Sequence, residues 1–526
     1  MLDRAHRGDI EGALGRISSF DVGPRRSSRS RIKTLVVVMG PGLVVMVANN
    51  DAGSISTFAQ AGQDYGLRWV WLVALLGTAL FVIQEMAGRL GTVTGAGHAR
   101  LIFERFGRRW GAFALVDLIA LNFLLVVTEL IGLQFGLAYF GVSRFVSVPV
   151  AAVGLICLTA TGSFRGWERG IYVLVVASAA VLPLLLVVHL YRHGPIPSAV
   201  GRHELSGTGV LFALAMVGTT VAPWQLFFQQ SNVVDKRITT RWLAYERADT
   251  LVGTTVFVIG AVAVIAACAA AFGGTPLHGA FVDAGAVADG IRARAGSWAG
   301  GLFALALIDG SILGAAAVTL STAYAVSDAT GMRHSLHRSW REAPTFYGAY
   351  GGCVVGAAAV VLLAASSLGV VTLAVQALSG VLFPSAAVFL LLLCNDRDVL
   401  GPWVNRWWLN ALAGLLVAVL LVLAALSGLN AVFPHLEPTW PAGILCAAGA
   451  IALLAVIRPL HKATPATAVP IMSLGDRANW SMPSLESLPR AHPSRARAVG
   501  LVTLRVYVGL AVIAVAVKIV RVAVGT

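Results

Sequence analysis

The stretch Asn49-Asn50-Asp51-Ala52-Gly53-Ser54 interrupts a segment that is otherwise apolar enough to cross a membrane. Apolar residues precede it over 34–48, and a weaker helical run follows over 55–65. The polar residues therefore fall near the middle of the bilayer, where they are costly unless they face protein or water. A helix broken at this depth is the usual sequence sign of a substrate or ion site in a transporter. The alternative interpretation is a polar kink buried in a helix bundle without a ligand.

The composition of the chain is that of a helical membrane protein. Of its 526 residues, 57% are hydrophobic and 12% are charged. An ordinary soluble domain carries about twice that charged fraction. Runs of about 20 apolar residues recur along the chain, and each is long enough for one helical span. The net charge of +14 comes mainly from Lys and Arg between these runs, as the positive-inside rule expects, and does not indicate a nucleic-acid partner.

We predict an all-α polytopic membrane protein with a transporter core of ten spans over residues 34–400. Residues 1–33 are expected to form a disordered, basic cytoplasmic arm. Two additional spans are expected within 401–458, and a polar cytoplasmic segment within 459–497. The last run, 498–526, is either a further span or an interfacial helix. The twelve expected spans are 34–65, 67–92, 111–139, 146–162, 169–191, 207–231, 249–272, 297–327, 349–367, 370–394, 408–428 and 442–457.

This span count places every strongly basic loop on one side of the membrane, together with the N-terminus. We therefore expect a cytoplasmic N-terminus in a plasma membrane, most simply the inner membrane of a bacterium. The sixth span is interrupted at Pro223, as the first is interrupted five spans earlier. An odd repeat length inverts the second half relative to the first. Spans 1–5 and 6–10 are thus expected to form two inverted repeats that share a central site.

Asp51 is the strongest candidate ligand in the first break. A carboxylate at this depth must be neutralised or paired with a positive charge, and few basic side chains in the apolar runs are placed to serve it. A mobile cation is the simpler partner, and a protonated structural Asp is the alternative. Gly53 permits local unwinding, which would free carbonyls near Ala48 to point at an ion.

The second break spans residues 218–224. Pro223 lacks an N–H and clashes with the carbonyl of Thr219, which is then free to coordinate a cation. An ordinary proline kink is the alternative, and the match with the first break counts against it. In the tenth span, Gln376 stands eight residues before Pro384. Its amide is expected either to bind an ion or water, or to form an interhelical hydrogen bond.

Other intramembrane carboxylates are open to two interpretations. Glu129 in the third span and Asp309 in the eighth could each serve as a cation relay or make a satisfied polar contact. For Asp309 we favour the polar contact. Glu85 is expected to pair with Arg89 on the next turn of the second span.

Several motifs stand in order along the chain: Gly40-Pro41-Gly42, Asp51-Ala52-Gly53-Ser54, the stretches 89–95 and 129–132, Ala222-Pro223, and Gln376 with Pro384. Together they resemble the Nramp family of divalent-metal transporters over residues 34–400. The resemblance implies a LeuT-like fold, alternating access and a metal site between spans 1 and 6. The expected metal-site residues are Asp51, Ser54, Ala48, Thr219, Ala222 and Gln376. The expected helix-break and pathway residues are Gly53, Pro223, Trp224, Gln229 and Glu129.

The chain departs from the family pattern at positions that concern metal selectivity and proton transfer. The family has Pro and Asn in the first break, Met and His around Pro223, a further His five residues on, and an Asp in span 3. Here the corresponding residues are Ala52, Ser54, Ala222, Trp224, Gln229 and Val126. The basic residues usual in span 9 are also absent from the sequence.

These departures look like those of the Nramp-related magnesium transporter branch. A Met thioether favours transition metals, and Ala222 cannot supply one. Mg²⁺ prefers oxygen ligands and gives up water reluctantly. We therefore expect Mg²⁺ transport, with Mn²⁺ also tolerated and without proton coupling. The membrane potential would drive it with about 4.6 kcal/mol per 100 mV for a divalent ion.

Three other functions stay open. One is proton-coupled Mn²⁺ or Fe²⁺ transport, as in the main family. Another is a non-transporting receptor or scaffold on a transporter fold, and a third is a sodium-coupled carrier of organic solutes. The sequence has no Walker A motif, so neither an ATP-driven pump nor an enzyme is expected, and no resident cofactor is predicted. The expected partners are the transported ion and the lipid bilayer.

Overall fold

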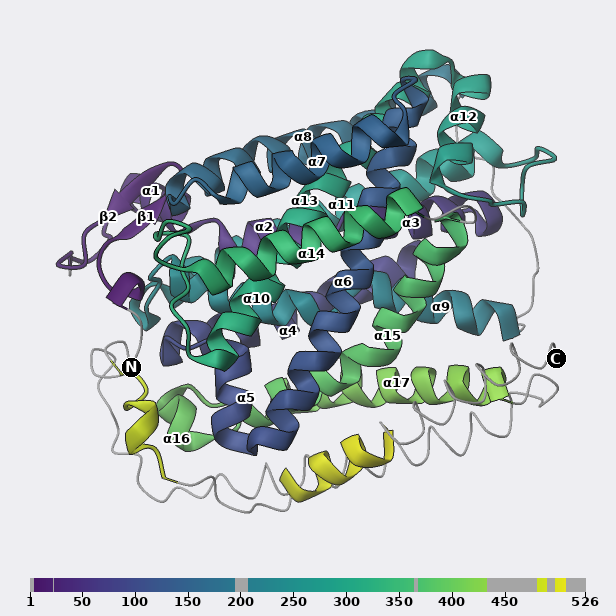
Figure 1. Cartoon of the computed structure of the whole chain (residues 1–526). Coiled ribbons are helices and arrows are strands. Elements are labelled where there is room, and N and C mark those ends of the chain that lie inside the picture. The colour runs from purple at the N-terminus through teal and green to yellow at the C-terminus, as the bar shows by residue number, and fades with distance from the viewer. Residues whose placement is uncertain are drawn as a thin grey trace.

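The computed structural model describes residues 4–21, 23–193, 207–363, 368–432, 480–489 and 497–507, most of them helical (Figure 1). The helices of the first predicted repeat are α2 (Pro41–Val47), α3 (Ala52–Tyr65), α4 (Val70–Thr94), α6 (Arg108–Tyr139), α7 (Arg144–Thr159) and α8 (Phe164–His193). Those of the second are α9 (Gly207–Thr220), α10 (Pro223–Asp235), α11 (Leu243–Phe272), α13 (Ser297–Thr330), α14 (Pro344–Leu363) and α15 (Leu368–Leu393). Shorter or peripheral helices are α1 (Ser28–Val38), α5 (His98–Phe106), α12 (Ala284–Ala295), α16 (Arg397–Leu400) and α17 (Trp407–Val432).

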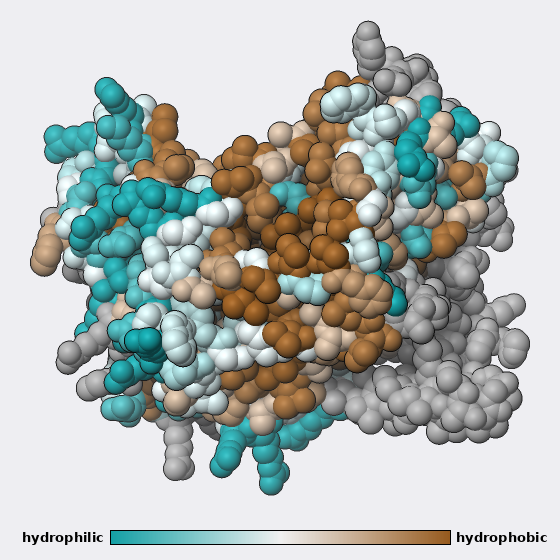
Figure 2. Space-filling view, turned by 45° about the horizontal axis from the view of Figure 1, so that its top comes forward, coloured by the Kyte–Doolittle hydropathy of each residue, from teal (hydrophilic) through white to brown (hydrophobic). Residues whose placement is uncertain are grey.

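The helices agree with the predicted spans as far as the residues are described. Seven helices of this part of the chain are long and apolar enough to cross a membrane. Spans 1 and 6 are each divided into two shorter helices, and α7 and the apolar part of α17 are also short. Figure 2 shows hydrophobic residues gathered in the middle of one face, with hydrophilic residues on either side. The predicted span 442–457 and most of 459–497 and 498–526 lie outside the described residues.

The break in the first span falls at the start of the predicted stretch 49–54. Helix α2 ends at Val47 and α3 begins at Ala52, so residues 48–51 lie between the two helices. Asp51 is the N-cap of α3, and its carboxylate accepts a hydrogen bond from the Ser54 N–H at 2.7 Å. Asp is a favoured N-cap because its side chain satisfies an N–H that the first turn leaves free. The carboxylate that starts α3 therefore also ends the break.

The N-terminal arm is ordered, and the expectation of disorder was wrong. Strands β1 (Ile10–Gly12) and β2 (Gly15–Ile17) form an antiparallel hairpin. Ile10 and Ile17 are buried in a small apolar cluster with residues of α1, α10 and the chain that follows α10. Arg237 donates hydrogen bonds to the carbonyls of Ala5 and Asp9. These partners come from distant parts of the sequence, so the polar composition of the arm gave no sign of them.

The hairpin, α5 and α16 lie toward one end of the molecule, and α12 lies at the opposite end (Figure 1). Arg105 of α5 forms ion pairs with Asp396 and Asp398 at 2.6 and 2.9 Å. The basic segments predicted on one side of the membrane thus gather with the arm. That this end faces the cytoplasm stays a prediction.

Candidate ion site at the two helix breaks

The two helix breaks lie against one another. The hydroxyl of Ser54 at the start of α3 lies 2.9 Å from the Thr219 hydroxyl, and it donates to the Thr219 carbonyl at 3.1 Å. The Asn49 amide donates to the Thr220 carbonyl at 2.8 Å. The Gln225 amide contacts both Asn49 and Thr220. The predicted pairing of the breaks at one central place is therefore confirmed. The side-chain amides of Asn49 and Gln225 donate to a backbone carbonyl of the second break.

Two carboxylates lie side by side at the start of α3. Asp51 is 3% exposed and Glu129 of α6 is fully buried. Glu129 accepts a hydrogen bond from the Ala52 N–H at 3.0 Å, and its other oxygen has no hydrogen-bond partner among the described residues. A Cβ on Gly314 of α13 would lie 2.7 Å from the Asp51 Cβ and 2.9 Å from Glu129 Oε2, so one stretch of α13 backs both groups. The site thus brings two acidic side chains together away from solvent.

Gln376 reaches the same place from α15. Its side chain is 2% exposed, and its Nε2 has no hydrogen-bond partner within the described ranges. A Cβ on Gly53 would lie only 1.6 Å from that Nε2. Gly53 lies inside α3 and has no positive φ. Its expected role in unwinding is therefore wrong, and its lack of a side chain instead makes room for the Gln376 amide.

The remaining predicted metal-site residues lie in the breaks. Ala48 is the C-cap of α2, and Ala222 is the N-cap of α10, directly before Pro223. The Ala222 N–H donates to Gln225 Oε1 at 3.2 Å. Pro223 occupies the first position of α10, where its missing N–H costs nothing. The Thr219 carbonyl accepts from Ser54, so it is engaged in this structure and not free as expected.

Two predicted pathway residues make hydrogen bonds outside the breaks. Trp224 is buried, and its carbonyl accepts a hydrogen bond from Ser321 at 2.8 Å. Gln229 lies further along α10 and donates to Glu246 of α11 at 2.6 Å. Neither residue contacts the breaks through its side-chain polar atoms in the described structure.

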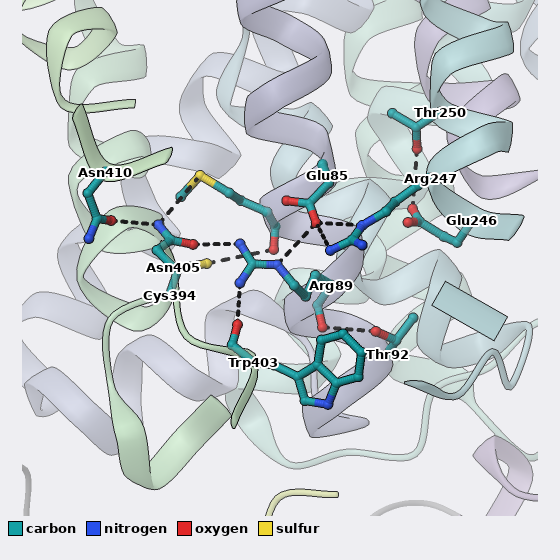
Figure 3. Close-up of polar contacts among 11 residues, drawn as sticks. Glu85, Arg89, Thr92, Glu246, Arg247, Thr250, Cys394, Trp403, Asn405 and Asn410 are labelled. Carbon is teal, nitrogen blue, oxygen red and sulfur yellow. Dashed lines mark hydrogen bonds and ion pairs between the residues drawn. The ribbon is translucent and has the colours of Figure 1, made fainter. Parts of the chain in front are cut away.

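The two polar contacts favoured from the sequence are confirmed. Ser178 donates a hydrogen bond to the Asp309 carboxylate. Arg89 pairs with Glu85 at 3.2 Å, and Arg247 pairs with the same Glu85 oxygen at 2.6 Å (Figure 3). Arg89 also donates to the carbonyl of Trp403 and to Asn405, so it fixes the chain ahead of α17.

Sequence reasoning missed the groups that hold α2 in place. The Asp249 carboxylate accepts hydrogen bonds from the N–H groups of Gly40, Gly42 and Leu43 at 3.1, 2.7 and 3.0 Å. Lys236 donates to the Met39 carbonyl and pairs with the Glu168 carboxylate at 2.6 Å. These charged residues lie at the edges of predicted spans, where the sequence suggests loop residues. Their closeness to apolar runs was the one sequence feature that could have indicated buried contacts.

The atoms that line the breaks are oxygens and amide groups. No group of three or more His, Cys, Asp or Glu side chains is placed to hold a metal ion within the described part of the chain. The predicted ligand residues are all at most 3% exposed, so the site is closed to solvent in this structure. Carboxylate, hydroxyl and carbonyl oxygens suit hard divalent cations, whereas imidazole and sulfur suit transition metals.

The family model described as "Natural resistance-associated macrophage protein-like" matches residues 42–430. This chain belongs to the Nramp family. Similar relatives include two proteins named "Divalent metal cation transporter MntH". The one from Verminephrobacter eiseniae is 27% identical over 419 residues, 74% of this chain and 88% of the relative. The one from Burkholderia ambifaria is 24% identical over 449 residues, 82% and 94% of the two chains.

The fold of this Nramp protein is that of a solved manganese transporter from Eremococcus coleocola. One structure of that protein matches with a TM-score of 0.61 at 18% identity and covers 86% of this chain and 98% of its own. Another, in complex with an aromatic bis-isothiourea substituted compound, matches with a TM-score of 0.60 at 16% identity over 84% and 97%. The architecture is LeuT-like, and the protein is an integral membrane transporter rather than an enzyme.

Proposed function

We propose that this Nramp protein carries divalent metal cations across the membrane by alternating access, with Mg²⁺ preferred and Mn²⁺ tolerated, and without proton coupling. The observation that carries the proposal is the residue at the N-cap of α10. Ala222 presents a methyl group at the break where the family pattern has a Met thioether. The ion would bind at Asp51, Ser54, Thr219 and Gln376, with Ala48 and Ala222 contributing backbone.

The chemistry of the breaks supports a hard, partly hydrated ion. Asp51 supplies a carboxylate, Ser54 a hydroxyl and Gln376 an amide, all buried. Mg²⁺ keeps several waters when it binds protein, which requires space as well as oxygen ligands. A methyl group at position 222 leaves more room for such waters than a Met side chain would. Loss of the sulfur also removes a preference for softer ions.

The absence of basic groups from α14 and α15 supports uptake without protons. Residues 342–396 of the sequence contain no Lys, Arg or His. A divalent ion gains about 4.6 kcal/mol per 100 mV of membrane potential, twice the value for a single charge. The potential across a bacterial inner membrane, negative inside, would therefore suffice for uptake. This orientation has the N-terminal hairpin in the cytoplasm.

Proton-coupled Mn²⁺ or Fe²⁺ transport is the second candidate. The solved structure with this fold is that of a manganese transporter, and the relatives are named divalent metal cation transporters, which is consistent with Mn²⁺ as the ion. Glu129 also lies beside Asp51, and an adjacent pair of carboxylates can share a proton that an arriving cation displaces.

Transport in proteoliposomes separates the two candidates. Uptake of Mg²⁺, Mn²⁺ and Ca²⁺ would be followed with a pH dye inside the vesicles, at a set potential. We expect Mg²⁺ and Mn²⁺ uptake without acidification, and no uptake by Asp51→Ala. Mn²⁺ uptake without Mg²⁺ uptake, or acidification in step with metal entry, would contradict the proposal.

A further inference from the structure

A second buried acidic cluster lies between α4, α10 and α11, away from the two breaks. Its centre is Glu246, on the first turn of α11, which is fully buried. Gln229 of α10 donates to Glu246 Oε1 at 2.6 Å, and the Thr250 hydroxyl donates to the same oxygen at 3.3 Å. The Glu246 carboxylate therefore has a fixed orientation, set by two neutral side chains.

The cluster leaves three buried oxygens without partners in the described structure. They are Glu246 Oε2, Gln229 Oε1 and Glu85 Oε2. A buried carboxylate oxygen without a donor is costly, because nothing replaces the water it has lost. Gln229 is fully buried and its amide is directed at Glu246, so its free carbonyl oxygen belongs to the same small region. These are the kinds of oxygen that a divalent cation binds.

Among the described residues, no positively charged group donates to Glu246. Arg89 and Arg247 both donate to the Oε1 atom of Glu85 (Figure 3). The charged groups that act most strongly on Glu246 are two further carboxylates, Asp249 and Glu85. Asp249 is engaged by the N–H groups at the start of α2. Glu246 is thus the one carboxylate of this set without a positively charged or backbone donor.

The backbone of α4 is shaped to admit the Glu246 carboxylate. A Cβ on Gly88 would lie 2.1 Å from Glu246 Oε1 and 2.9 Å from Oε2. Gly88 is three residues after Glu85, so both face the same side of α4. The Glu246 carboxylate therefore rests directly on the backbone of α4.

The cluster lies between the second break and the end of the molecule that holds the hairpin. Gln229 is six residues beyond Pro223 in α10, which is about 9 Å along a helix. The helix then continues to Lys236, beside the arm and the start of α2. An ion that left the breaks along α10 would therefore pass Gln229.

We propose that Glu246, with Gln229, forms a second binding site for a divalent cation on the way out of the transporter. This inference rests on the proposed transport function for its direction, but the site itself does not require Asp51. The site would hold the ion briefly after it leaves the breaks and before it leaves the protein.

Mn²⁺ binding to the intact protein in lipid nanodiscs tests the site, because bound Mn²⁺ is lost from the solution electron paramagnetic resonance signal. We expect wild type to bind a second Mn²⁺ per chain, and Asp51→Ala to keep that second ion. Glu246→Gln should lose it and retain the ion at the breaks, and the double variant should bind none. Gln at 246 keeps an oxygen for Gln229 and Thr250, so folding should be preserved, as thermal unfolding would verify.

Two further variants make the result specific. Gly88→Ala should also remove the second ion, because the new methyl displaces a flexible carboxylate without changing any charge. Glu104→Gln is the control: Glu104 is an exposed residue of α5 that pairs with Arg100 at 2.9 Å, and its loss should change nothing. In uptake assays, Glu246→Gln should lower the maximal rate several-fold.

The inference is overturned if folded Asp51→Ala binds no Mn²⁺, or binds as much as Asp51→Ala/Glu246→Gln does. A failure of the proposed function would look different. It would leave wild type without transport, while the comparison of those two variants would still report on the second site.

Discussion

The hydroxyl groups of Ser54 and Thr219 lie 2.9 Å apart and join the broken helices α3 and α9 at the centre of the protein. Ser54 also donates to the Thr219 carbonyl, which Pro223 has released from the helix. A carbonyl has two lone pairs, so it can accept from Ser54 and still face an ion. Substitution of Ser54 therefore tests whether this contact holds the two breaks together.

Ser54→Ala should weaken the contact between α3 and α9. A lost hydrogen bond of this kind costs about 1 kcal/mol, and a buried acceptor left unpaired adds to that. We expect lower metal uptake with a modest loss of thermal stability, measured in proteoliposomes and by thermal unfolding. Ser56→Ala, on the same helix, is the control. Equal effects of the two substitutions would argue against a special role for Ser54.

Asp51→Asn should abolish uptake while it spares the fold. Asn is as good an N-cap as Asp, so α3 keeps its first-turn hydrogen bond, but the charge that attracts a cation is gone. Asp51→Ala removes the cap as well, at a cost of about 1 kcal/mol. The two variants should therefore match in uptake and differ in melting temperature. Measurable uptake by Asp51→Asn would remove Asp51 from the proposed ligand set.

Ala222→Met should shift selectivity toward softer ions. The thioether adds a ligand that Mn²⁺ and Cd²⁺ accept better than Mg²⁺ does. We expect the ratio of Mn²⁺ to Mg²⁺ uptake to rise, as measured by competition in proteoliposomes. Ala222→Leu has a similar volume without sulfur and is the matched control. If Leu changes the ratio as Met does, the effect is one of space and not of ligand chemistry.

Gly53→Ala should impair transport through Gln376. The new methyl would occupy the position of the Gln376 amide nitrogen, so one of the two must move. The double variant Gly53→Ala/Gln376→Ala relieves this overlap and should recover thermal stability without recovering full uptake. Recovery of both properties would mean that the Gln376 amide has no role at the ion site.

Asp249→Asn should loosen the start of α2. One carboxylate now accepts three backbone N–H groups there, and an amide offers a single oxygen in place of two. Hydrogen exchange at residues 40–43 should become faster in detergent-solubilised protein. Asp289→Asn, at an exposed ion pair on α12, should leave that exchange unchanged. Unchanged exchange in Asp249→Asn would show that other contacts hold α2.

The breaks could be predicted because polar residues at mid-membrane depth need a reason. Asp51 and Pro223 indicated the positions of the two helix breaks, and the inverted repeat followed from the spacing between them. The capping contact that ends the first break at Asp51 depends on backbone geometry, which spacing does not encode. The sequence could not show that Glu246 is buried in a polar cluster, because that cluster depends on contacts with Gln229 and Gly88, which lie on two other helices. The polar composition of the arm suggested disorder. The contacts that order it, such as those of Arg237, come from residues far away in the sequence.

The N-terminal hairpin packs at once against Val38, which ends α1 just before α2 begins, and Val233, near the end of α10. Under the proposed transport function, an ion that leaves at this end requires these segments to separate, and the hairpin holds them together. We expect an antibody fragment or peptide bound to the hairpin to stop transport without competing with the metal, so its inhibition would be independent of ion concentration.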